Sequence, residues 1–417
     1  MKLLLVVPTY PHPGHPFSGV FNQRCAHALR QACERVEVLA PRPYSPPLLG
    51  RFKTRWKMYS RIPRLQEDRG ILVHRPGFVQ LPGIVPTLWA DPATYGVCRR
   101  VALRLQERHG FDAILSFDLL GAGSLAWRLG RLLHLPAAGW ATGSDVRYAP
   151  TSPEGRLVTR ALRVLDMVFC QSRELLARAA FLLGVPPNRM EETRYVVLPR
   201  GVATPGAIPR NEMRRALRSE WGIGDENVVV LAVGRISREK GTFELLEAVR
   251  AARRSNPRIV CVLVGAHAGF DDSADVMRSL ATDPTLRDAV RVVPACAPDR
   301  VWEHLSAADI FAFTSHREGM PNSLLEAMAM EVPAVAFGIP PVLEIEANTG
   351  AVQTVPPLDV GALSQALVAL AASPSERVRL GRLGRRRVEA NYLVAKNMAL
   401  AVRYLAGISP ATMLRGA

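Results

Sequence analysis

The stretch VVVLAVGRISREKG (228–241) decides the fold class of the second half of the chain. Its first six residues form an uninterrupted apolar run, which is typical of a strand buried on both faces of a parallel sheet. Gly234 ends the run, and Gly241 follows two cations, Arg235 and Lys240, where an amphipathic helical pattern begins. A strand, a glycine-containing loop and a helix in this order indicate a doubly wound α/β fold.

The first half of the chain begins in the same way. The apolar run KLLLVVPTY (2–10) closes with turn residues, and a helical pattern runs from Phe21 to Leu29. Further apolar runs alternate with helical patterns: VEVLAP (36–41), AILSF (113–117), MVFCQS (167–172), IVCVLVGA (259–266), VRVVP (290–294), IFAFTS (310–315) and VPAVAFG (332–338). This alternation predicts two Rossmann-like domains with parallel sheets. Because ligands bind at the carboxyl ends of such strands, we expect a cleft between two facing sheets.

The length and one irregular segment predict the domain boundaries. A chain of 417 residues exceeds what one compact core usually holds. The segment LPRGVATPGAIPRNEMRR (198–215) is rich in Pro and Gly and lacks periodicity, which is typical of a linker. We therefore predict domains at 1–200 and 201–388. The helical pattern in 389–417 is compatible with a return to the first domain.

The charge of the chain is strongly asymmetric. The formal net charge is +16; residues 1–200 hold 28 Lys and Arg against 14 Asp and Glu, whereas the remainder holds 25 against 23. This predicts that the first half meets an anionic partner: nucleic acid, a membrane surface or an acidic substrate. The six scattered cysteines include no C-x-x-C pair, so neither a zinc site nor a disulfide framework is indicated. The apolar runs are too short for a secretory signal or a membrane span, which favours a cytoplasmic protein, with peripheral attachment to the inner face of the plasma membrane left open.

The loop from Gly234 to Gly241 has the features of an anion site. Glycine allows a ligand to approach the backbone closely, and the following helix start directs free N–H groups and a positive dipole toward it. Arg235 and Lys240 could reach the same oxyanions from two sides. The alternative is that both are solvated loop charges. The spacing excludes a P-loop.

A second site lies in SHREGMPNSLLEAMAME (315–331), where a strand end, a turn and a helix start follow one another. Asn322 or Ser323 could cap the helix, and the free N–H groups of Ser323 and Leu324 would suit a diphosphate.

Two glutamates flank this helix start. Glu318 precedes the turn, where it could accept hydrogen bonds from sugar hydroxyls. Glu326 lies one turn into the helix, where it could hold a ribose diol. One ligand, a nucleotide diphosphate with a sugar attached, would account for both carboxylates. The alternative is an ordinary helix cap with a surface glutamate.

These stretches, together with SGVFNQRCAHAL (18–29), TGSDVR (142–147) and LSAADIFAFTS (305–315), resemble retaining glycosyltransferases of family 4 with their E-x7-E signature. The resemblance implies the GT-B fold. It also implies that Arg235, Lys240 and Glu318 are catalytic, the cations stabilising the leaving diphosphate while Glu318 contacts the transferred sugar. The implied donor-binding residues are Gly19, Gly234, Met320, Pro321, Asn322, Ser323, Leu324 and Glu326, and the implied acceptor-side residues are Thr142 and Asp145. Many relatives have His where this chain has Thr142, so any role of that histidine is absent or altered.

The function implied by the resemblance is transfer of a hexose, with retention, from a UDP- or GDP-linked donor to a lipid-linked or saccharide acceptor. Bacterial polysaccharide or glycolipid synthesis is the expected setting. We expect no metal and no further cofactor, because Arg235 and Lys240 can stabilise the diphosphate. A nucleotide-sugar 2-epimerase of the same architecture and a non-enzymatic basic binder of membrane or nucleic acid remain alternatives. The base, sugar, acceptor, linkage and oligomeric state stay open.

The stretch LLGRFKTRWKMYSRIPR (48–64) holds six Arg and Lys and no acid, with apolar residues at helical spacing. This predicts an interfacial helix on an anionic membrane. The expected contacts are Arg51, Phe52, Lys53, Arg55, Trp56 and Lys57. A solvated basic helix is the alternative, and nucleic acid is disfavoured because no binding motif accompanies the stretch. His12 and His15 follow the first strand near the expected cleft, where solvated loop side chains are the usual case.

Overall fold

The computed structural model describes residues 1–44, 59, 61–79, 86–191, 194–206, 208–266 and 271–408. The chain forms two compact units, Met1–Arg200 with Val394–Ala417 (unit 1) and Gly201–Leu393 (unit 2). Unit 2 extends past residue 388 because helix α16 (Pro374–Asn391) packs against α13 (Asn322–Ala329). Helix α8 (Arg210–Glu220) begins within the segment that we predicted to be a linker.

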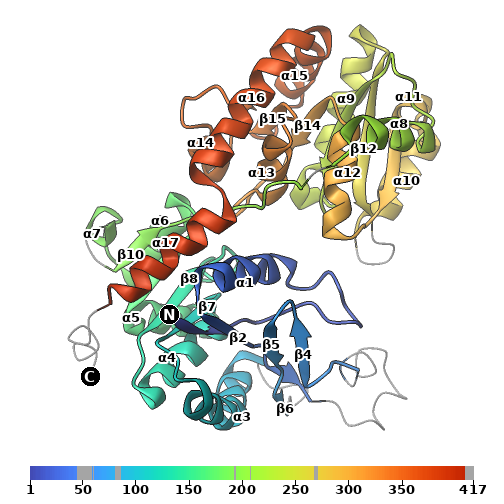
Figure 1. The fold of residues 1–417 in the computed structure, drawn as a ribbon. Coiled ribbons are helices and arrows are strands. Elements are labelled where there is room, and N and C mark those ends of the chain that lie inside the picture. The colour runs from blue at the N-terminus through green and yellow to red at the C-terminus, as the bar shows by residue number, and fades with distance from the viewer. Residues whose placement is uncertain are drawn as a thin grey trace. The chain divides into compact units, whose positions relative to one another are not determined.

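Unit 1 is built on an eight-stranded sheet with the order β10-β9-β8-β7-β1-β2-β5-β4 (Figure 1). Neighbouring strands are parallel except for the antiparallel pair β4 and β5. The strands are β1 (Lys2–Val6), β2 (Arg35–Leu39), β4 (Leu65–Asp68), β5 (Ile71–His74), β7 (Ala113–Phe117), β8 (Ala137–Ala141), β9 (Met167–Cys170) and β10 (Tyr195–Val197). A separate parallel pair joins β3 (Arg42–Pro43) and β6 (Gly77–Phe78). The central position of β1 explains why Leu3, Leu4 and Leu5 are fully buried.

The helices of unit 1 follow the strands in the order that a parallel sheet requires. They are α1 (Val20–Ala32), α3 (Pro86–His109), α4 (Ala122–Leu133), α5 (Pro153–Val164), α6 (Arg173–Leu183), α7 (Asn188–Glu191) and α17 (Val394–Ala406). Helix α4 packs on β7 and β8, and α17 from the end of the chain packs against α1 (Figure 1).

Unit 2 has a six-stranded parallel sheet with the order β13-β12-β11-β14-β15-β16. The strands are β11 (Val228–Val233), β12 (Ile259–Ala266), β13 (Val290–Pro294), β14 (Ile310–Phe313), β15 (Ala334–Phe337) and β16 (Gln353–Val355). The remaining helices are α9 (Thr242–Ser255), α10 (Ser273–Thr282), α11 (Pro284–Ala289), α12 (Val301–Ala307), α14 (Pro340–Glu346) and α15 (Val360–Ala372), with short 3-10 turns η2 (Arg238–Lys240) and η3 (Pro298–Arg300). The prediction of an α/β fold with parallel sheets is confirmed.

Each sheet changes winding direction beside its central strand. In unit 2 the chain builds outward from β11 through β12 to β13, then crosses to β14 on the other side of β11. In unit 1 it builds outward from β1 through β2, then crosses to β7. Loops that leave adjacent parallel strands at such a switch point diverge and leave a crevice for a ligand. The loops 234–241 and 314–321 leave β11 and β14 at this position in unit 2.

The predicted membrane contacts cannot be placed in this fold. Arg51, Phe52, Lys53, Arg55, Trp56 and Lys57 all lie outside the described residues. Across the part of the chain that the structure describes, no helix has both the length and the apolar character needed to cross a bilayer.

Candidate active site

Gly241 allows the loop after β11 to touch the loop after β14. Its φ of 66° is in the left-handed region, and a Cβ atom at this position would lie 1.9 Å from the carbonyl oxygen of Thr314. The same two segments are joined by a hydrogen bond, because the Thr314 Oγ1 donates to the carbonyl oxygen of Lys240 at 3.0 Å. The Ser237 Oγ caps η2 by accepting from the Lys240 N–H at 3.3 Å. These contacts place Lys240 beside the end of β14.

The two loops bring together the predicted catalytic residues Lys240 and Glu318. The Lys240 Nζ forms an ion pair with the Glu318 Oε1, which also accepts from the Ser315 Oγ at 3.1 Å. Both side chains are partly covered, with exposed fractions of 31% for Lys240 and 18% for Glu318. The cation and the sugar-contacting carboxylate that we inferred from separate stretches therefore meet at one point.

Arg235, the other predicted catalytic cation, is 57% exposed and pairs with Glu239. Its Nη2 is 3.5 Å from the Glu239 Oε2, while Arg317 Nε donates to the Glu239 Oε1 at 3.1 Å. The hydrogen bond from Arg317 holds the pKa of Glu239 below its usual range. Glu239 was not among the predicted site residues, because its contact with Arg317 joins two loops that are distant along the chain.

Helix α13 begins without a side-chain cap, so the prediction that Asn322 or Ser323 caps it is wrong. Pro321 occupies the N-cap position, and the Asn322 N–H donates to the carbonyl oxygen of Met320 at 3.0 Å. Met320 and Pro321 are buried and anchor the turn. Ser323 and Leu324 in the first turn have N–H groups with no intrahelical acceptor, as helix starts require. Two backbone donors are thus directed toward the loop that carries Glu318.

The two glutamates of the E-x7-E pattern have different environments. Glu318 lies in the partly open loop, whereas Glu326 is 4% exposed within α13. Gly234, at the end of β11, has a φ of 150° and open space where a Cβ would lie. Its backbone is therefore accessible beside the loop that carries Lys240.

In unit 1 the predicted residues lie at the carboxyl ends of β1 and β8. Gly19 is the N-cap of α1 with a φ of 77°, and a Cβ there would lie 2.5 Å from the carbonyl oxygen of Thr9. Thr142 follows β8 and is half-buried. Asp145 is 1% exposed and accepts from the N–H groups of Thr142 at 3.0 Å, Gly143 at 2.8 Å and Leu119 at 3.0 Å. Asp145 therefore holds the backbone of this edge in place.

Asp118 is a candidate that the sequence analysis did not single out. It directly follows β7, next to β1, and has a φ of 120°, which is rare for a residue other than glycine. Its Oδ1 accepts from the N–H groups of Gly121 at 3.1 Å and Ala122 at 3.4 Å. Burial, and then the charge of Asp145, raise the pKa of Asp118. Backbone strain and a raised carboxyl pKa at a switch point are features of functional sites. The pattern in the sequence that could have indicated Asp118 is the apolar run AILSF (113–117), which this acidic residue directly follows.

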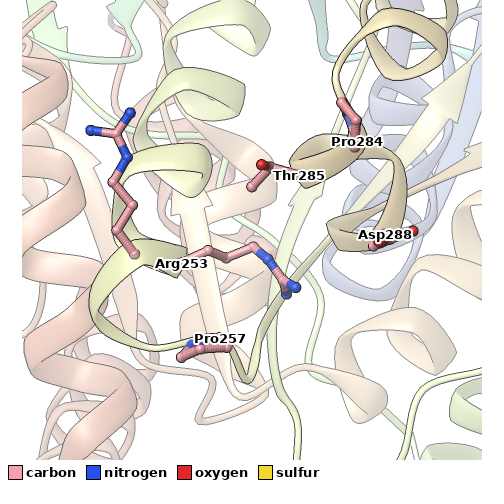
Figure 2. A pocket seen from close by; sticks show the side chains of 6 residues that line it. Arg253, Pro257, Pro284, Thr285 and Asp288 are labelled. Carbon is pink, nitrogen blue, oxygen red and sulfur yellow. The ribbon is translucent and has the colours of Figure 1, made fainter.

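A surface hollow of about 390 Å³ lies elsewhere in unit 2. Figure 2 shows it between the end of α9 and the start of α11. Its lining residues are Arg253, Arg254, Pro257, Pro284, Thr285 and Asp288. Because Pro257 precedes β12, this hollow lies toward the amino end of that strand and away from the loops that carry Lys240 and Glu318. Among the described residues no group of three or more His, Cys, Asp or Glu side chains could hold a metal ion.

Comparison with known proteins points to the two loops that carry Lys240 and Glu318. Residues 213–387 match the family model of glycosyl transferases group 1, and this span includes both loops of the site. A curated protein of Bacillus subtilis, described as a teichuronic acid biosynthesis glycosyltransferase, is 26% identical over 81% of this chain and 81% of its own length.

Two solved structures share the fold. Sucrose-phosphate synthase from Thermosynechococcus elongatus superposes with a TM-score of 0.72 at 19% identity, covering 98% of this chain and 100% of that one. HepE of Anabaena, solved in complex with UDP-glucose, superposes with a TM-score of 0.68 at 16% identity, covering 97% of this chain and 100% of that one. The chain therefore has the GT-B fold of these proteins, and its residues 213–387 match the glycosyl transferases group 1.

Proposed function

We propose that this protein is a retaining glycosyltransferase that moves a hexose from a nucleotide-diphosphate donor to a lipid-linked or saccharide acceptor. The observation that carries the proposal is the contact between Lys240 and Glu318, whose loop leads into the first turn of α13, where the N–H groups of Ser323 and Leu324 have no intrahelical acceptor. A cation and backbone donors suit a diphosphate, and an adjacent carboxylate suits the hydroxyls of its sugar. All four groups lie at the switch point of one sheet, where a ligand is expected.

The chemistry follows from where charge develops. Cleaving the bond between the sugar and the diphosphate builds negative charge on the leaving phosphate oxygens, so donors already held in place lower the barrier. Lys240 is paired with Glu318. A bound diphosphate would attract the ammonium group, which would leave the Glu318 carboxylate available to the sugar hydroxyls. Attack on the same face of the sugar, with the diphosphate accepting the acceptor proton, would retain the configuration without a metal ion.

The comparisons support the class of donor and of pathway. HepE was solved with UDP-glucose, and the Bacillus subtilis relative is described by teichuronic acid biosynthesis. We propose a UDP-linked donor first, a GDP-linked donor second, and a role in bacterial polysaccharide or glycolipid synthesis. Asp118 and Thr142 are the proposed acceptor contacts in unit 1, held in place by Asp145. Peripheral attachment through residues 51–57 stays part of this proposal.

Calorimetric titration with UDP, GDP and ADP tests the proposal. We expect one diphosphate to bind the wild type and to lose affinity in Lys240→Ala and Glu326→Ala. Turnover of the corresponding nucleotide sugar should fall by about 10²–10³ in Lys240→Ala, as for loss of one preorganised charge donor. Arg300→Ala is the control, because it also removes a cation from an ion pair with a glutamate, Glu303, but at a helix start that carries no predicted site residue. Binding of none of the three nucleotides, or equal loss in the control, would show the proposal to be wrong.

A further inference from the structure

Three cationic or titratable side chains converge at the carboxyl edge of the sheet in unit 1. Arg42 follows β2, Arg75 follows β5 and His12 lies in the loop after β1. Because β1, β2 and β5 are parallel neighbours, their following residues emerge at the same edge. Arg75 is 2% exposed and Arg42 is 9% exposed, whereas His12 is half-buried and open to solvent. We call Arg42, Arg75 and His12 the arginine cluster.

Neither guanidinium group of the arginine cluster contacts a carboxylate within the described residues. The Arg75 Nη2 donates to the carbonyl oxygen of Pro11 at 2.9 Å, and the Arg42 Nη1 donates to the carbonyl oxygen of Tyr59 at 2.9 Å. The Arg75 Nη1 and the Arg42 Nε are buried, and neither has a hydrogen-bond partner in the part of the chain that the structure describes. A buried donor that is left unsatisfied destabilises the folded state. The hydrogen bond to Pro11 therefore uses only one of the two terminal nitrogens of the Arg75 guanidinium group.

Asp68, the carboxylate that acts electrostatically on Arg75, is already engaged in hydrogen bonds. One Asp68 oxygen accepts from the Tyr10 hydroxyl at 2.7 Å and from the Gln23 amide at 2.8 Å, and lies 2.9 Å from the His27 Nε2. These three contacts occupy the hydrogen-bonding capacity of the Asp68 Oδ2. Asp68 is the acid that acts on Arg75 electrostatically, but it makes no ion pair with it among the described residues.

The groups of the cluster repel one another. Burial, and secondarily the charge of Arg42, lowers the pKa of Arg75 to about 10, against the opposing effects of Tyr10 and Asp68. Burial, then the charges of Arg75, His15 and Arg42, lower the pKa of His12. The Gly14 N–H donates to the His12 Nδ1 at 3.2 Å, so the neutral ring carries its proton on Nε2 and is itself a donor there. The cluster thus presents N–H donors and excess positive charge. Burying these like charges together destabilises the fold, and a bound anion would offset that destabilisation.

We propose that the arginine cluster binds an oxyanion, a phosphate or carboxylate group carried by the acceptor. The proposal rests on the glycosyltransferase function above and adds that the acceptor is charged. Arginine suits the task because its planar fork can donate two parallel hydrogen bonds to a phosphate or carboxylate. Residues 13–17 beside His12 are exposed and His12 itself is half-buried, so the imidazole is the most exposed member of the cluster.

Binding of inorganic phosphate, glucose 1-phosphate, glucuronate and glucose to the full chain tests the inference, with the nucleoside diphosphate present in excess to occupy unit 2. We expect at least one of the three anions to bind at concentrations up to about 10 mM, and glucose not to bind. Arg75→Gln and Arg42→Gln should each weaken that binding about tenfold or more, since each removes a charge-assisted donor. The anion that binds most tightly shows whether the acceptor carries a phosphate or a carboxylate. Equal binding of inorganic phosphate and glucose 1-phosphate would show that the phosphate group alone is recognised.

Arg194→Gln is the matched control. This arginine donates to the carbonyl oxygens of Leu162 and Arg163, but it precedes β10 and so lies at the amino edge of the same sheet. It should leave anion binding unchanged. If Arg75→Gln fails to fold, His12→Gln on the exposed loop serves instead and should weaken binding severalfold. Binding that is unaffected in the Arg42, Arg75 and His12 variants, or lost only in Lys240→Ala, would overturn the inference. Because nucleotide binding is measured separately, failure of the donor site is distinguishable from failure of this one.

Discussion

Substitution of Gly241 by alanine tests whether the contact between the two loops of unit 2 builds the site. The added Cβ would lie 1.9 Å from the carbonyl oxygen of Thr314, whereas an ordinary carbon–oxygen contact is longer than 3 Å. Thr314 cannot retreat freely, because its Oγ1 donates a hydrogen bond to the carbonyl oxygen of Lys240 and because it directly follows β14, which lies inside the sheet. The loops would therefore separate by more than an ångström, and Lys240 would move away from Glu318.

The magnitude follows from a matched control in the same unit. Gly222 has a φ of 65°, nearly equal to the 66° of Gly241, but a Cβ at Gly222 meets open space. Gly222→Ala should cost about 1–2 kcal/mol, the price of a left-handed alanine. Gly241→Ala carries the same cost and adds about 1–3 kcal/mol for overpacking.

Thermal unfolding, with nucleotide titration beside it, measures both effects. For a unit of this size, 1 kcal/mol lowers the Tm by about 2–4 °C. We expect Gly241→Ala to lower the Tm of the unit 2 transition roughly twice as far as Gly222→Ala, and only Gly241→Ala to lose nucleotide affinity. Equal Tm shifts in the two variants, or full nucleotide affinity in Gly241→Ala, would refute the reasoning.

Two further predictions concern carboxylates of unit 1. Burial and the Asp145 charge raise the pKa of Asp118, so its ionisation opposes folding, and stability is lost as the pH rises through the folded-state pKa. Asp118→Asn should therefore raise the Tm more at pH 8 than at pH 5 while raising the acceptor KM; a variant with unchanged acceptor kinetics would remove Asp118 from the site. Burial raises the pKa of Glu37, but the hydrogen bond from His74 and the charges of His109 and His74 outweigh it, so the folded-state pKa is lowered. That stability is present above the ordinary Glu pKa of about 4.3 and is lost as the pH falls through the folded value. Glu37→Gln should lower the free energy of unfolding more at pH 5.5 than at pH 3; urea unfolding at both pH values measures it, and a loss independent of pH would contradict the lowered pKa of Glu37.

Part of the candidate site was predictable because it is local in sequence. Lys240 lies at the end of a strand–loop–helix unit and Glu318 in the turn that precedes a helix, so the residue types and their spacing indicated an anion site and a sugar contact. The pairing of Lys240 with Glu318 was not visible, since it depends on β11 and β14 being neighbours although they are separated by two strands along the chain. Glu239 was missed for the same reason, because its partner Arg317 comes from the other loop.

The sequence by itself determined the fold class and indicated an anion site in the loops after β11 and β14, because apolar runs, glycines and helix starts act through their immediate neighbours. Only the tertiary structure decided which cations have no carboxylate partner among the described residues. Arg75 donates to Pro11 and Arg42 to Tyr59 because β1, β2 and β5 are aligned in one sheet. The Asp68 carboxylate instead contacts Tyr10, Gln23 and His27. The burial of a side chain and the electrostatic potential around it depend on groups that are distant along the chain. No local sequence pattern could therefore reveal the arginine cluster or the strained Asp118.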